Sequence, residues 1–179
     1  MRLVFDLEAN GLYNAHQNKT GDWEKEADTI WCIVTKDIDT GEVHKYKNGV
    51  ICTTAIESGI EVLQLADELI GHNIIDYDLR LIKKLYPSFS PKCLVLDTYI
   101  LSSLLNPDRK GGHSLGQYGE ELGIAKPVHE DWSKFSPEML HRCTEDVHIN
   151  HKVYELLMEE AYEDVRGLEY HKIFTGGLT

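Results

Sequence analysis

Two carboxylates stand two positions apart in the segment Phe5-Asp6-Leu7-Glu8-Ala9, directly after a short apolar run. Side chains at positions i and i+2 of a strand point to the same face of the sheet. Asp6 and Glu8 therefore lie side by side if this segment is a strand. Neighbouring carboxylates repel each other unless a cation lies between them. The pair predicts either a metal site or, more simply, the solvated end of a strand.

Two further aspartates follow at wide intervals along the chain. Asp78 lies at the start of an expected helix, where Asp76 or Asp78 would act as an N-cap in the simpler interpretation. Asp146 lies on a long amphipathic helix, five residues after His141. At about 100° per residue these two side chains are about 140° apart, so both can border one pocket. Taken alone, such a pair is typical of a helix surface.

Length and charge narrow the classes of protein. The 179 residues, 42% of them hydrophobic, are enough for one domain with its own core. The 18 basic and 30 acidic residues leave a net charge of −12, which argues against a broad basic nucleic-acid-binding face. A metal enzyme acting on nucleic acid stays open, because bound cations invert the local charge of a carboxylate site.

The chain carries no signal of a membrane or an oxidising compartment. No apolar run approaches the ~20 residues that cross a bilayer, and the N-terminal apolar run contains acid, unlike a signal peptide. The scattered cysteines are typical of reduced intracellular thiols. They are Cys32, Cys52, Cys93 and Cys143. We expect a cytoplasmic protein of a bacterial or phage-infected host cell, with no membrane partner.

Apolar periodicity and turn residues predict strands that alternate with helices. The expected strands are 2–5, 29–38, 42–47, 70–73 and 93–96, and the expected helices are 53–69, 77–85, 97–105, 114–122 and 138 to beyond 157. Strands 29–38 and 42–47 form a hairpin. Asp97 is expected as a structural N-cap, and Ser136 as the N-cap of the last helix. This order predicts an α/β fold in which helices cover a mixed sheet.

Taken together and in this order, the motifs resemble the DEDD superfamily of 3′→5′ exonucleases, and above all the proofreading domain of phage-type family A DNA polymerases. They are FDLEANGL at 5–12, HNIIDYD at 72–78, LDT at 96–98, GHSL at 112–115, YGEELG at 118–123 and RCTEDV at 142–147. The resemblance spans residues 3 to 157 and implies a ribonuclease H-like fold. It further implies an exonuclease domain over 1–158 and a C-terminal helical tail over 159–179 that links to a polymerase domain or partner.

The resemblance implies a centre of two Mg²⁺ or Mn²⁺ ions. Asp6 would bridge both ions, Glu8 and Asp146 would hold the ion that activates water, and Asp78 would hold the second through water. Hard cations prefer oxygen ligands, and two ions about 3.5–4 Å apart can activate a water and stabilise the leaving oxygen. The residues expected to bind substrate are Asn10, Leu12, His72, Asn73 and Arg142, with Leu12 as an apolar wedge against the terminal base.

The residue that orients the attacking water divides the superfamily. One branch carries a tyrosine four residues before the last aspartate, and the other carries a histidine five residues before it. This chain has Arg142 and His141 at those positions. Arginine does not give up its proton at neutral pH, whereas histidine titrates near it. We therefore expect His141 as the general base; the alternative is a site that has lost its tyrosine, with Arg142 clamping a phosphate.

The expected activity is hydrolysis of single-stranded DNA from its 3′ end, releasing nucleoside 5′-monophosphates and proofreading during replication. The expected partners are the 3′ end of single-stranded DNA and a DNA polymerase domain or subunit. Two alternatives stay open: a 3′→5′ exoribonuclease, because no residue discriminates the 2′-hydroxyl by inspection, and a catalytically dead binding domain of a polymerase. All four candidate acids are present, which speaks against the dead domain.

Overall fold

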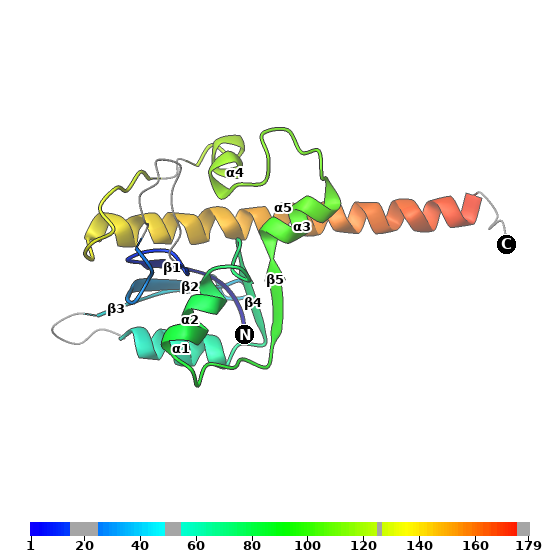
Figure 1. Cartoon of the computed structure of the whole chain (residues 1–179). Helices are drawn as coiled ribbons and strands as arrows, with labels where there is room; N and C mark the ends of the chain where they lie inside the picture. The colour runs from blue at the N-terminus through cyan, green and yellow to red at the C-terminus, as the bar shows by residue number, and fades with distance from the viewer. Residues whose placement is uncertain (15–24, 49–54, 125–126, 175–179) are drawn as a thin grey trace.

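The computed structural model describes residues 1–14, 25–48, 55–124 and 127–174 (Figure 1). Its sheet consists of β1 (Arg2–Ala9), β2 (Ile30–Asp37), β3 (Val43–Lys47), β4 (Glu68–Gly71) and β5 (Leu94–Asp97). The strand order is β3-β2-β1-β4-β5. The first three strands pair antiparallel, whereas β4 runs parallel to β1 and β5 parallel to β4. The mixed sheet and the hairpin expected from the sequence are both confirmed.

Strand β1 continues four residues past its predicted end at Phe5 and carries both acids within the sheet. Its side chains alternate between two cores. Leu3, Phe5 and Leu7 pack into the core on one face, whereas Val4 packs into the core on the other. Since alternate residues share a face, Asp6 and Glu8 lie on the same side as Val4. The sequence pattern of this one strand thus determines which face carries the candidate site.

Helices α1 (Ile56–Gln64) and α2 (Asp78–Leu85) lie on the Leu3 side of the sheet. The helix predicted over 53–69 is too long: it ends at Gln64, and positions 53 and 54 fall outside the described residues. Leu69 instead belongs to β4, together with Ile70 of the predicted strand 70–73, and the two are fully buried in opposite cores. A strand with parallel neighbours is buried on both faces, so its sequence is a continuous apolar run. Here the start of that run also fitted the helical spacing, and the predicted helix was extended into the strand.

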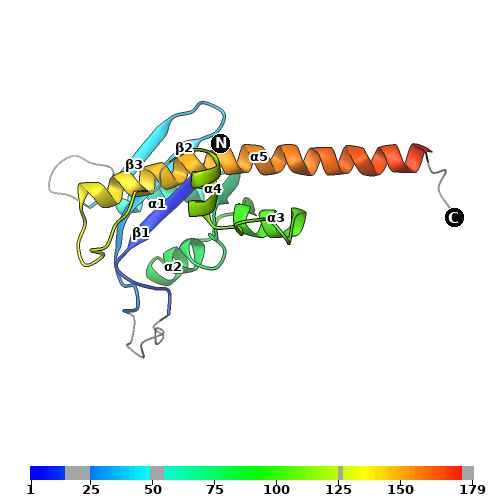
Figure 2. The same cartoon turned by 90° about the horizontal axis from the view of Figure 1, so that it is seen from above.

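Helix α5 (Pro137–Phe174) covers the opposite face of the sheet and extends well beyond it (Figures 1 and 2). Met139, Cys143 and Val147 pack against the Val4 side of the sheet. The Ser136 hydroxyl accepts a hydrogen bond from the Met139 amide at 3.1 Å, which confirms the predicted N-cap. The helix runs unbroken across residues 158 and 159, where the predicted exonuclease domain meets the predicted tail.

Two short helices, α3 (Thr98–Leu105) and α4 (Leu115–Glu121), pack beside α5. Leu115 and Tyr118 of α4 share a buried cluster with residues of α5, the last of which is Leu157. Helix α3 begins at the predicted N-cap, Asp97, and the N-cap of α4 is Ser114. None of the helices in the described part of the chain has the length and apolar character that crossing a bilayer requires.

Candidate metal centre and nucleic-acid site

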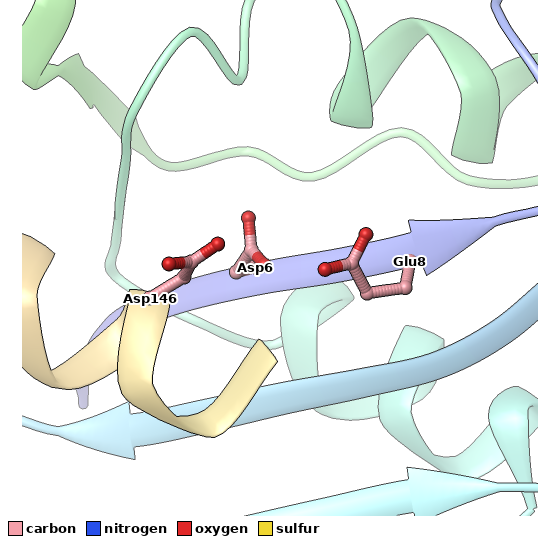
Figure 3. Close-up of side chains that lie close together, drawn as sticks. All are labelled: Asp6, Glu8 and Asp146. Carbon is pink, nitrogen blue, oxygen red and sulfur yellow. The ribbon is translucent and has the colours of Figure 1, made fainter. Parts of the chain in front are cut away.

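Three carboxylates meet between the sheet and α5. One oxygen each of Asp6, Glu8 and Asp146 lies within 4.8 Å of the others. Figure 3 shows Asp6 and Glu8 on the strand and Asp146 reaching them from the helix. The helix packs closely here, because the Cys143 Sγ atom donates to the Asp6 carbonyl oxygen at 3.4 Å. Asp146 follows Cys143 by three residues, on the same helical face, which places its carboxylate over the strand.

Asp78 is the fourth acid, at the first position of α2. The N-cap of this helix is Tyr77 and no side chain caps it, so the simpler interpretation of Asp76 or Asp78 as an N-cap is wrong. Asp78 is only 4% exposed, and its Oδ1 atom has no hydrogen-bond partner among the described residues. Burial, and next the negative charge of Asp6, raise the pKa of Asp78 well above its usual value. The two carboxylates therefore act on each other electrostatically.

Asp97 stabilises the turn that precedes Asp78. Its carboxylate caps α3 by accepting from the amides of Tyr99 and Ile100, as predicted. It also accepts from the amides of Asn73 at 2.9 Å and Ile75 at 3.1 Å. These two residues lie in the turn before α2, where Asn73 has a φ of 62°, a conformation that asparagine tolerates better than most residues. Sequence analysis had found the cap but not this second role.

Replacing Asp97 with alanine should lower the free energy of unfolding by about 2–4 kcal/mol, because buried amides lose a charged acceptor. Chemical denaturation measures this loss. Asp97→Asn is the matched control: its remaining carbonyl oxygen can keep the Oδ1 bonds to Asn73 and Tyr99, so only the Oδ2 bond to Ile75 is lost. An alanine variant as stable as the wild type would contradict this role of Asp97.

The pKa of Glu8 is strongly raised. Burial raises its pKa to about 10, and the negative charge of Asp6 adds to the rise. The positive charge of Arg142 opposes it. The Arg142 Nε atom lies 3.5 Å from Glu8 Oε1 and 3.9 Å from Asp146 Oδ2. The centre therefore concentrates negative charge in a poorly solvated place and holds one fixed cation at its edge.

The structure does not bring His141 to the acids. Its side chain is 63% exposed and its Nδ1 atom lies 3.9 Å from Glu145 Oε1. The reason is helical geometry: Arg142 precedes Asp146 by four residues and shares its face, whereas His141 precedes it by five. The role of His141 as the general base stays a prediction.

A cavity of about 490 Å³ opens next to the acids. Its lining includes Glu8, Leu12, Tyr77 and Trp132. The Tyr77 hydroxyl donates to the Gly11 carbonyl oxygen at 2.5 Å and so ties the Leu12 segment to the loop before α2. Trp132 packs at the edge of the core and also lines the cavity.

The other predicted substrate residues occupy distinct places. The Asn10 amide is engaged within the protein: it donates to Asp28 Oδ1 at 2.6 Å and accepts from the Asp28 amide at 3.0 Å. The Nδ1 atom of His72 lies 3.0 Å from Thr98 Oγ1. Asn73 is exposed at the turn before α2. Of these three residues, Asn10 is the one that lines the cavity.

The donor set fits a hard divalent cation. It consists of carboxylate oxygens, which Mg²⁺ and Mn²⁺ prefer to thiols or imidazoles. The buried Asp78 oxygen without a hydrogen bond, together with the raised pKa values of Asp78 and Glu8, indicates a cluster that lacks positive charge. A divalent cation would relieve this repulsion, and the residues that would hold it are Asp6, Glu8, Asp78 and Asp146.

Comparison with known proteins bears on the fold. No protein-family model matches the chain, and no curated protein sequence does. Brucella melitensis NrnC bound to pGG is similar in structure, with a TM-score of 0.63 at 18% identity over 97% of this chain and 79% of that one. NrnC has also been solved with bound Mg²⁺.

Two other solved structures are similar over most of this chain. The family B DNA polymerase of Pyrobaculum calidifontis gives a TM-score of 0.60 at 13% identity, covering 87% of this chain and 24% of that one. Escherichia coli Exonuclease I in complex with dT13 gives 0.50 at 12%, covering 95% and 43%. At these identities the likeness shows the fold, a ribonuclease H-like sheet flanked by helices like that of the DEDD-type exonucleases.

Proposed function

We propose that this chain is a metal-dependent 3′→5′ exonuclease that hydrolyses single-stranded DNA and releases nucleoside 5′-monophosphates. The observation that carries the proposal is the meeting of Asp6, Glu8 and Asp146 within 4.8 Å beside a cavity. Divalent cations held there, two if the resemblance extends to their number, would supply an activated water and stabilise the leaving 3′ oxygen.

Other residues around the acids are proposed to bind the substrate. Leu12 and Trp132 supply the apolar wall of the cavity, against which the terminal nucleoside can pack. Asn10, His72 and Asn73 stay as proposed contacts around the terminal nucleotide, and Arg142 as a contact to phosphate. A 3′ end fits such a site only as a single strand, because the terminal base must be unpaired to enter the cavity.

A basic hollow beside α2 supports the binding of a longer strand. Three cations, Arg80, Lys83 and Lys84, line a second cavity of about 510 Å³ together with Tyr13. The Arg80 guanidinium lies 4.4 Å from the centre of the Tyr13 ring. Tyr13 follows the Leu12 of the first cavity in sequence. Cations interleaved with an aromatic ring are typical of surfaces that follow a nucleic-acid single strand.

The direct test is cleavage of 5′-labelled single-stranded DNA and of the same sequence as RNA, each with Mg²⁺ and with EDTA. We expect a Mg²⁺-dependent ladder that shortens from the 3′ end, faster on DNA. Faster cleavage of RNA would replace the DNA assignment with an exoribonuclease. No cleavage of either substrate with Mg²⁺ or Mn²⁺ would contradict the proposal and favour a dead binding domain.

The likeness to NrnC bound to pGG favours including very short substrates in this assay. We propose that the first cavity takes the terminal nucleotides and that the basic hollow contacts only longer strands. An enzyme that prefers longer strands should use the hollow, whereas one that acts on the shortest oligonucleotides should not. The ratio of rates on long and two-nucleotide DNA therefore measures what the hollow contributes.

We further infer a role in proofreading beside a DNA polymerase domain or subunit, with residues 159–179 as the link. The resemblance supports this role, as does the extension of α5 beyond the sheet. Adding the chain to a primer–template with a mismatched or a matched 3′ end tests it. Proofreading predicts faster removal of the mismatched nucleotide, and equal rates would contradict it.

His141 is proposed as the base that orients the attacking water, which requires its exposed ring to turn toward the acids when substrate binds. His141→Ala should then lower the rate by about 10²–10⁴-fold, the usual contribution of a general base. A larger loss in Arg142→Ala would contradict the assignment.

A further inference from the structure

We propose that Arg142 is a built-in cation that competes with divalent metal for Glu8 and Asp146 and thereby lowers the metal affinity of the centre. The inference rests on the proposed function, because it assumes that these carboxylates bind the metal. It also explains why this position carries an arginine, which suits neither of the two branches described above.

The position of Arg142 follows from the helix. It lies one turn before Asp146 on the same face of α5, and its Nε atom is 3.5 Å from Glu8 Oε1 and 3.9 Å from Asp146 Oδ2. Its side chain is only 21% exposed. The guanidinium is therefore close to two of the three clustered carboxylates, in a place where water screens charges weakly.

Contacts with residues other than the acids hold the Arg142 side chain in this position. Its Nη1 atom donates to the Pro127 carbonyl oxygen at 3.2 Å, and its guanidinium lies 5.2 Å from the centre of the Trp132 ring. Trp132 is itself anchored, because the Trp31 indole nitrogen donates to its carbonyl oxygen at 3.0 Å. These contacts are independent of the acids, so the cation stays at the edge of the centre when the acids change their charge.

The interaction of Arg142 with the two carboxylates is nevertheless weak. Its Nε atom is buried, yet within the described structure it makes no hydrogen bond, only the two ion-pair contacts. A small divalent cation binds carboxylate oxygens directly, at about 2.0–2.1 Å for Mg²⁺. Metal can therefore displace Arg142 from the carboxylates, but it must bind next to a charge that does not titrate away.

The charge balance of the centre shows why repulsion between Arg142 and bound metal affects metal affinity. Two divalent cations would already balance the carboxylates of Asp6, Glu8, Asp78 and Asp146. Arg142 then leaves one positive charge in excess, which one phosphate of a bound strand would balance. In the absence of nucleic acid, the full complement of metal is therefore disfavoured, and Arg142 links metal binding to the arrival of phosphate.

The test is direct titration of the metal-free chain with Mn²⁺, without nucleic acid, with free Mn²⁺ measured by electron paramagnetic resonance. Arg142→Gln should bind Mn²⁺ about 10- to 100-fold more tightly than the wild type, because a charge within ion-pair distance of two ligands is removed. Arg142→Lys keeps the charge and should stay within a few-fold of the wild type. Arg2→Gln is the matched control: it removes an arginine that pairs with Asp39 at the opposite end of β1 from Glu8, and the Mn²⁺ affinity should stay unchanged.

Arg142→Met is the second variant, because its unbranched side chain can still pack on Trp132 if the glutamine variant does not fold; it should also tighten Mn²⁺ binding. Equal Mn²⁺ affinities of the wild type and the neutral variants would overturn the inference and leave the proposed function standing. Failure of both the wild type and the neutral variants to bind Mn²⁺ would contradict the proposed metal centre itself, and the inference with it.

Discussion

Asp6→Asn should lower the rate of cleavage by at least about 1,000-fold while the chain stays folded. Metal ions contribute several kcal/mol to such reactions, and each 1.36 kcal/mol is a factor of ten in rate. Asp6 is the proposed ligand shared by both ions, and its charge acts on Glu8 and on Asp78. Losing it therefore weakens every metal contact of the centre at once.

The measurement is single-turnover cleavage of single-stranded DNA by the variant and by a matched control. Asp67→Asn makes the same change at an exposed aspartate that pairs with the N-terminal ammonium and lines neither of the two cavities described above. The control should keep its activity, since Asp67 does not belong to the clustered acids. An Asp6→Asn variant that kept a tenth of the wild-type rate would refute the metal assignment.

Glu8→Gln should make the metal-free chain more stable, by about 2–4 kcal/mol near pH 7.5. The pKa of Glu8 is about 10 in the fold, against an ordinary value of 4.5. Between those values the folded chain holds a proton that the unfolded chain releases, so the free energy of unfolding falls as pH rises. A neutral amide of the same shape avoids this cost. The acid is thus kept at a site where it destabilises the fold, which is typical of a functional residue.

The same substitution should change how stability depends on pH and on metal. Without metal, the melting temperature of the wild type should fall from about pH 5 to about pH 9, and that of Glu8→Gln should fall less, because only Asp78 then keeps a strongly raised pKa. Mg²⁺ should stabilise the wild type, and more so at higher pH, because binding needs the deprotonated carboxylate. Glu61→Gln, at an exposed position of α1, is the control. A wild type whose stability did not depend on pH or Mg²⁺ would contradict the unusual state of Glu8.

The sequence by itself determined the elements that carry the site. The alternation of apolar and acidic residues over 2–9 was enough to place Asp6 and Glu8 on one face of a strand. The apolar stripe of α5, with Met139, Cys143 and Val147, likewise predicted which face of that helix is buried. These features follow from the periods of strand and helix, which each segment expresses locally.

Only the tertiary structure decided how these elements meet. Local pattern misplaced the boundary between α1 and β4, because Leu69 is apolar for a reason that lies in the neighbouring strands and helices. It also left open whether Asp78 caps its helix, whereas in the structure Tyr77 is the N-cap of α2 and no side chain caps it. The role of Asp97 in holding the loop before Asp78 likewise depends on residues more than twenty positions apart.

The choice between His141 and Arg142 shows the same division. The sequence led us to expect His141 at the acids, whereas the structure places Arg142 beside Glu8 and Asp146 and leaves the His141 side chain exposed. Local pattern could not decide this, because it depends on the rotation of the helix about its axis as it packs on the sheet. The contact of Cys143 with the Asp6 backbone sets this rotation and turns Arg142 toward Glu8 and Asp146. Side-chain direction is a local property, but the partner it meets is decided by packing.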